Sequence, residues 1–136
     1  MTTKLEKVLY TADTHTTGGR LDVQLAPIGS SKPGTNPEQL FGVGYSACFI
    51  GAMQRAAAIH EIRMSQDTAV DASVSLGRAE ADTVFALAVK LAMTLPGLTE
   101  AHKRLVVETA HQICPYSRSI RGNVDVTFDL RENLRQ

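Results

Sequence analysis

The stretch NPEQLFGVGYSACFIGAM, residues 36–53, predicts the central helix of the fold. Asn36 can cap this helix, Pro37 suits its first turn, and Gln39 can reach back to complete a capping box. The residues that follow are apolar on nearly every side, which is typical of a helix that is buried all round. We expect the helix to run on to about Ile62.

The apolar character of this helix predicts a homodimer. A domain of 136 residues cannot easily surround such a helix, so we expect residues 40–53 to pack against a second copy of the chain. Gly42, Gly44 and Gly51 lie within the helix, where each glycine costs about 1 kcal/mol relative to alanine. Close approach of another backbone would offset that cost.

Alternating apolar and polar residues on both sides of the helix predict β-strands. The expected strands are residues 4–14, 21–25, 70–76, 85–93 and 124–130. A second helix is expected over residues 99–113, ended by Pro115. The strand at 85–93 carries apolar residues on both faces, so we expect cover on both. Strand pairs joined by short turns favour antiparallel pairing, and we predict one α+β domain over residues 1–136.

Charge and composition argue against several classes of function. The 14 basic and 14 acidic residues cancel, so the chain lacks the positive field that nucleic acids and anionic membranes attract. No apolar run approaches the roughly 20 residues that span a bilayer. The first residues lack the apolar core of a signal peptide, and phosphate-binding glycine spacings are absent. We therefore expect a cytoplasmic protein without a membrane or nucleic-acid partner.

Cys48 and Cys114 carry the most distinctive chemistry of the sequence. Two cysteines are too few for a disulfide scaffold, and the simplest interpretation is a pair of buried, small apolar residues. Burial inside a helix raises the pKa of a thiol, so a reactive Cys48 needs a nearby cation. The arginines near its loops and helices are Arg20, Arg55, Arg118 and Arg121.

Two other kinds of site involve the second cysteine. His111 and Cys114 are three residues apart on one expected helix, so one face could carry both. No CxxC or HxxxH pair completes a set of four ligands, and we expect no bound metal. A cysteine–histidine hydrolase dyad is the other alternative, although no local motif supports it.

Two long motifs, each with a cysteine, resemble the OsmC family and most closely its organic hydroperoxide resistance branch. The resemblance covers residues 4–130. Its motifs are residues 35–41 and 44–49 around the first cysteine, 114–117 and 121–126 around the second, and 5–12 and 17–20 near the start.

The resemblance implies an OsmC-like α+β fold in an intertwined homodimer, with two active sites at the subunit interface. It also implies a thiol peroxidase that reduces organic hydroperoxides. Cys48 would be the peroxidatic thiol and Cys114 the resolving thiol. Glu38 corresponds to the acidic partner, and Arg20 to the arginine that activates the thiolate. A relative that serves as a thiol-dependent hydrolase or a small-molecule binding protein is the alternative.

The resemblance further implies that no cofactor is bound. The reductant would be an external dithiol, a dihydrolipoyl group on a lipoylated carrier protein. The position of Glu38 leaves one question open, because ten residues of straight helix separate it from Cys48 by about 15 Å. Either the helix breaks at Gly42 or Gly44, or Glu38 serves Cys48 of the partner subunit.

Overall fold

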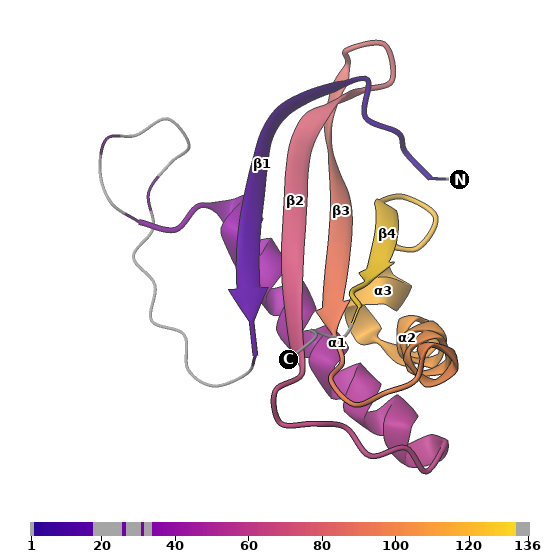
Figure 1. Cartoon of the computed structure of the whole chain (residues 1–136). Coiled ribbons are helices and arrows are strands. Elements are labelled where there is room, and N and C mark those ends of the chain that lie inside the picture. Colours follow the sequence, from indigo (N-terminus) through magenta and orange to yellow (C-terminus); the bar gives the residue numbers. More distant parts are fainter. Residues whose placement is uncertain (1, 18–25, 27–30, 32–33, 133–136) are drawn as a thin grey trace.

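A four-stranded sheet and three helices form the part of the chain that this computed structural model describes, residues 2–17, 26, 31 and 34–132 (Figure 1). The elements are β1 (Lys7–Thr16), α1 (Pro37–Ile59), β2 (Ala69–Ala79), β3 (Val84–Thr94), α2 (Glu100–Ile113), α3 (Pro115–Ile120) and β4 (Asp125–Leu130). The α+β prediction is confirmed. The strand expected at residues 21–25 lies outside the described residues.

The strands are ordered β1-β2-β3-β4, and α1 crosses one face of the sheet (Figure 1). β1 pairs with β2 and β2 with β3 in antiparallel fashion, as expected. β4 pairs with β3 in parallel, however, so the antiparallel prediction is wrong for this pair. α2 and α3 form the connection between these two strands, and a connection of that length returns the chain to the same end of the sheet.

The strand β3 is covered over only half of its length. Leu91 and Met93 are fully buried, whereas Phe85 is 66% exposed. The prediction of cover on both faces therefore fails for the first half of the strand. This first half also lies beyond β4, which pairs with β3 only from Ala88 onward.

The capping box at the start of α1 is present. Gln39 N–H donates to the side-chain oxygen of Asn36 at 2.9 Å, and Asn36 N–H donates to Gln39 Oε1 at 3.0 Å. The helix then continues without a break to Ile59, slightly short of the expected end. Its buried side packs on the sheet and on α2. The largest fully buried side chains of this core include Tyr45, Phe49, Met53, Val70, Val74, Leu91, Met93 and Val106.

Two of the three helix glycines allow close packing within the chain. A Cβ atom at Gly42 would lie 2.9 Å from Thr14 Oγ1 of β1, and a Cβ atom at Gly44 would lie 3.4 Å from the ring of Tyr116. These two glycines therefore admit side chains of β1 and α3 of the same chain, and not the second backbone that was predicted.

The third glycine lies on an uncovered side of α1. A Cβ atom at Gly51 would meet nothing within 4 Å, and Ala47, Gln54 and Ala58 on the same side are exposed. This stripe, in which all residues but Gln54 are small, is available to a second chain. Burial against a partner stays a prediction.

Pro115 ends α2, as expected, but it also begins α3. Proline suits the first position of a helix because its fixed φ is helical and that position needs no N–H donor. Cys114 consequently caps the end of α2 and the start of α3. None of the described helices is long and apolar enough to cross a membrane.

Candidate active site

The two cysteines lie in contact with each other. The Cys114 thiol donates to the sulfur of Cys48, and their Sγ atoms are 3.4 Å apart. Both are free thiols. Cys48 is half-buried in the middle of α1, whereas Cys114 is completely buried at the junction of α2 and α3. The structure therefore brings together two of the four predicted site residues, from opposite halves of the chain.

The helix junction directs Cys114 toward α1. The backbone N–H of Cys114 donates to the Ala110 carbonyl at 2.8 Å and so closes α2. Its carbonyl accepts from the Arg118 N–H at 2.9 Å and so opens α3. Between these two bonds its backbone is extended, at φ −65° and ψ 124°. This corner fixes the thiol against the middle of α1.

The environment of Cys48 does not by itself favour a thiolate. Burial raises the pKa of the Cys48 thiol, a backbone hydrogen bond from Tyr116 lowers it, and the neighbouring Cys114 raises it again. Among the described residues no arginine contributes to this balance. Arg55 and Arg118 are exposed, and Arg20 lies outside the described residues.

Arg121 is engaged elsewhere. Its guanidinium donates a short hydrogen bond to the carbonyl oxygen of His111. Burial is the main cause that lowers the pKa of His111, and the positive charge of Arg121 lowers it further. The cation that a reactive Cys48 needs is therefore absent from the part of the chain described here.

Glu38 lies in the first turn of α1 and does not reach Cys48 in its own chain. The unbroken helix separates the two by about 15 Å, so a break at Gly42 or Gly44 is ruled out. Glu38 is buried, and its Oε2 atom has no hydrogen-bond partner among the described residues. A buried carboxylate oxygen in this condition is costly unless a donor reaches it.

The sequence did not indicate a buried polar network beside the cysteines. Ser117 Oγ lies 2.6 Å from the hydroxyl of Tyr45 and 2.9 Å from Nδ1 of His111. Tyr45 and Ser117 are fully buried. Burial raises the pKa of Tyr45 to about 12, and it is the main cause that lowers the pKa of His111. Both groups are therefore neutral at pH 7. The one hint in the sequence was spacing, because Tyr45 lies three residues from Cys48, and His111 and Ser117 lie three residues from Cys114.

A family described as OsmC-like protein matches residues 29–129 of the chain. The chain belongs to the OsmC family. The organic hydroperoxide resistance protein of Xanthomonas axonopodis pv. citri (strain 306) is 42% identical, over 92% of this chain and 96% of that protein. The organic hydroperoxide resistance protein OhrA of Bacillus subtilis (strain 168) is 35% identical, over 94% of this chain and 100% of that protein.

Solved structures agree with the family assignment. The crystal structure of the organic hydroperoxide resistance protein OhrB of Bacillus subtilis matches with a TM-score of 0.74 at 34% identity, over 90% of this chain and 98% of that chain. The resemblance of the cysteine motifs to the organic hydroperoxide resistance branch of the OsmC family is thereby confirmed.

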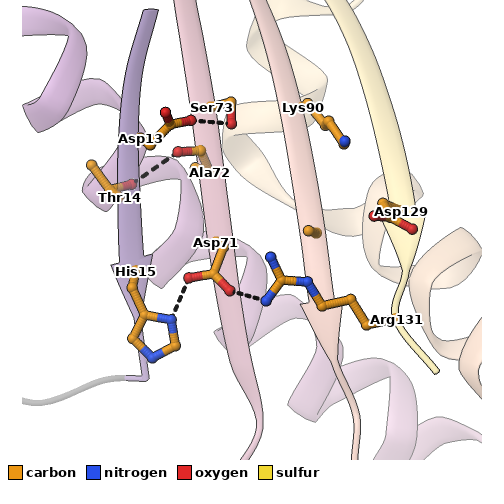
Figure 2. Close-up of a pocket in the computed structure, with 10 residues that line it drawn as sticks. Asp13, Thr14, His15, Asp71, Ala72, Ser73, Lys90, Asp129 and Arg131 are labelled. Carbon is orange, nitrogen blue, oxygen red and sulfur yellow. Dashed lines mark hydrogen bonds and ion pairs between the residues drawn. The ribbon is translucent and has the colours of Figure 1, made fainter. Parts of the chain in front are cut away.

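One hollow of this OsmC-family chain is lined by neither cysteine. It has a volume of about 390 Å³ and lies on the face of the sheet opposite the helices (Figure 2). Asp71 there pairs with both His15 and Arg131, while Lys90 and Asp129 stand on the neighbouring strands. One solvated polar face is usual for an antiparallel sheet, and the lining of this hollow offers no thiol.

The described residues do not support the two alternative sites. They hold no group of three histidine, cysteine or acidic side chains that could bind a metal ion. The ring of His111 is bonded to Ser117, and no described histidine forms a hydrogen bond with either sulfur. A metal site at His111 and Cys114, or a hydrolase dyad, gains no support from this geometry.

Proposed function

We propose that this OsmC-family protein is a thiol-dependent peroxidase that reduces organic hydroperoxides to alcohols. The observation that carries the proposal is the 3.4 Å contact between the Sγ atoms of Cys48 and Cys114. A pair of thiols at this distance can become a disulfide with little movement of the chain. The names of the relatives, which refer to organic hydroperoxide resistance, support the same substrate class.

The difference in exposure assigns the two roles. The half-buried Cys48 is open to a small molecule, whereas Cys114 is closed to one. The Cys48 thiolate attacks the hydroperoxide, the O–O bond breaks, and an alcohol leaves after it gains a proton. Cys48 is then a sulfenic acid. Cys114 attacks that sulfur, the S–O bond breaks, and water leaves as the disulfide forms.

Glu38 supports the assignment of Arg20 as the activating cation. A guanidinium within about 4–6 Å favours the thiolate and lowers its pKa, and a carboxylate can hold that guanidinium by two hydrogen bonds. Glu38 presents a buried oxygen without a described partner, which suits such a role. Because Glu38 is far from Cys48 along α1, we propose that it and Arg20 complete the site of the partner subunit.

A homodimer follows from this arrangement and from the uncovered stripe of small residues on α1. Gly51→Leu is expected to leave the fold of the single chain intact, because a Cβ atom there meets nothing within 4 Å and leucine favours a helix. A bulky side chain should keep a second helix away and convert the dimer to a monomer. Light scattering at micromolar concentration measures this change.

A surface control isolates the dimer effect. Gln66 is exposed in the segment between α1 and β2, so Gln66→Leu should leave the mass unchanged. A monomeric wild-type protein, or a Gly51→Leu variant that stays dimeric, would contradict the predicted interface.

Apolar side chains beside the cysteines suit an organic substrate. Ile113 and Tyr116 flank Cys114 in sequence and are 37% and 42% exposed. They can receive an alkyl or fatty-acid chain while the peroxide group meets Cys48.

We propose an external dithiol as reductant, a dihydrolipoyl group on a carrier protein, which exchanges with the disulfide. No bound cofactor is required, and a reducing cytoplasm suits this cycle.

The direct test is consumption of cumene hydroperoxide by the pre-reduced protein. We expect one equivalent to be consumed per subunit without reductant, and continuous turnover with dihydrolipoamide. Thioredoxin with its reductase, supplied at the same dithiol concentration, should support much slower turnover. A reduced protein that consumes no hydroperoxide would overturn the proposed function, whereas turnover with thioredoxin alone would overturn only the proposed reductant.

A further inference from the structure

The hydroxyl of Ser117 joins the three helices that surround the cysteine pair. It belongs to α3 and contacts Tyr45 of α1 at 2.6 Å and His111 of α2 at 2.9 Å. Tyr45 lies three residues before Cys48, and His111 three residues before Cys114. Residues at this spacing share one side of a helix. One hydroxyl therefore fixes the segment that carries each thiol.

The network is complete in its hydrogen bonding. Tyr45 can donate to Ser117, and Ser117 can donate to Nδ1 of His111, so each hydroxyl proton has an acceptor. The neutral state of His111 leaves Nδ1 free to accept. His111 and Ser117 both line a hollow of about 140 Å³. His111 is half-buried and is the accessible end of the network, whereas Tyr45 and Ser117 are fully buried.

This inference rests on the proposed function. We propose that Ser117 is a positioning residue for the second chemical step, in which it keeps Cys114 docked against Cys48 so that the disulfide closes before a second hydroperoxide arrives. In that step the S–S bond forms, the S–O bond of Cys48 breaks, and the hydroxyl leaves as water with the proton of Cys114. The competing reaction oxidises the sulfenic acid to a sulfinic acid and releases a second alcohol.

Besides Ser117, α3 is held by Tyr116, whose ring packs on Tyr45 and whose backbone bonds to Cys48, and by the half-buried Ile120. This helix is a single short one of six residues, and its other side chains are mostly exposed. Ser117 is its only residue that is fully buried. Loss of the hydroxyl would leave the buried Tyr45 oxygen without its partner, and such a group costs more than the bond itself contributes. The docked population of α3, and with it the rate of disulfide closure, should fall.

The experiment compares Ser117→Ala with Ser119→Ala under increasing cumene hydroperoxide. Ser119 lies in the same helix, but it is exposed and its hydroxyl donates to the carbonyl of Tyr116 at 2.8 Å. Mass spectrometry gives the fraction of Cys48 present as sulfinic acid after one exposure. In Ser117→Ala we expect half-conversion to sulfinic acid at about tenfold lower hydroperoxide. Ser119→Ala should match the wild type.

A second variant separates positioning from general destabilisation. Tyr45→Phe keeps the buried ring and removes only the hydroxyl, and it should shift the half-conversion point in the same direction. The rate of the first oxidation, followed by stopped-flow, should stay within twofold of the wild type in both variants. Sulfinic acid formation unchanged in both Ser117→Ala and Tyr45→Phe would overturn the inference.

Two further outcomes decide between the inference and the function on which it rests. An equal shift in Ser119→Ala would show that any change in α3 has the effect, and it would remove the special role of Ser117. A wild-type protein that forms neither a sulfenic acid nor a disulfide would overturn the proposed function, and the inference with it. A normal first oxidation with an unmoved half-conversion point overturns the inference alone.

Discussion

Cys48→Ser is expected to abolish hydroperoxide reduction, with a loss of roughly 10³-fold or more in the rate of the first oxidation. The serine hydroxyl stays protonated at neutral pH and cannot replace a thiolate as the nucleophile. Cys114 cannot take over, because it is completely buried. Stopped-flow measurement of hydroperoxide consumption by the pre-reduced variant gives this rate.

Cys114→Ser is the matched variant and should behave differently. It keeps the nucleophile, so it should consume the first equivalent at close to the wild-type rate. Without a second thiol the reaction then stops at the sulfenic acid, which excess hydroperoxide oxidises further. Equal residual turnover in the two variants would contradict the assignment of roles.

Arg20→Met is expected to raise the apparent pKa of Cys48 by about one unit or more, because the opposite charge that favours the thiolate is lost. Burial already raises this pKa, and among the described residues only the backbone hydrogen bond from Tyr116 lowers it. Alkylation of Cys48 by iodoacetamide, measured against pH, reports the thiolate fraction. At pH 7 the rate should fall about tenfold, and it should approach the wild-type rate only above the shifted pKa.

Arg118→Met and Arg121→Met are the controls for Arg20. Arg118 is exposed and Arg121 is bonded to the carbonyl of His111, so neither variant should move the curve by more than a few tenths of a unit. Glu38→Gln should shift it in the same direction as Arg20→Met but less, because it only misplaces the guanidinium. If the pH curve of alkylation moves in Arg121→Met and not in Arg20→Met, the activating cation is Arg121 and the assignment to Arg20 is wrong.

Local features of the fold could be predicted from the sequence because the residues that determine them are neighbours in the chain. The capping box of Asn36 and Gln39 involves residues three apart, and both of its hydrogen bonds are present. The alternation in β2 and β3 likewise depends on each strand alone. Pro115 shows where local reasoning stops, because proline both ends a helix and suits the first position of another.

Features that depend on tertiary structure were harder to predict from the sequence. The parallel pairing of β3 and β4 depends on how α2 and α3 pack, which no periodicity reports. The motifs singled out Cys48 and Cys114, but their contact joins positions 66 residues apart. Ser117 lay within a recognised motif, yet its role depends on the directions of three side chains from three helices. The role of Arg20 stays a prediction.

The unequal exposure of the two sulfurs also determines how the oxidised protein can be reduced. In the disulfide, an incoming thiolate must approach one sulfur in line with the S–S bond and expel the other. Only the Cys48 side is open, so the reductant should become linked to Cys48 while Cys114 departs as the buried leaving group. Regeneration of the protein is thus regioselective. Reductants should be selected by whether their thiol can reach the half-buried Cys48, which favours a dithiol on a long flexible arm over one set in a broad protein surface.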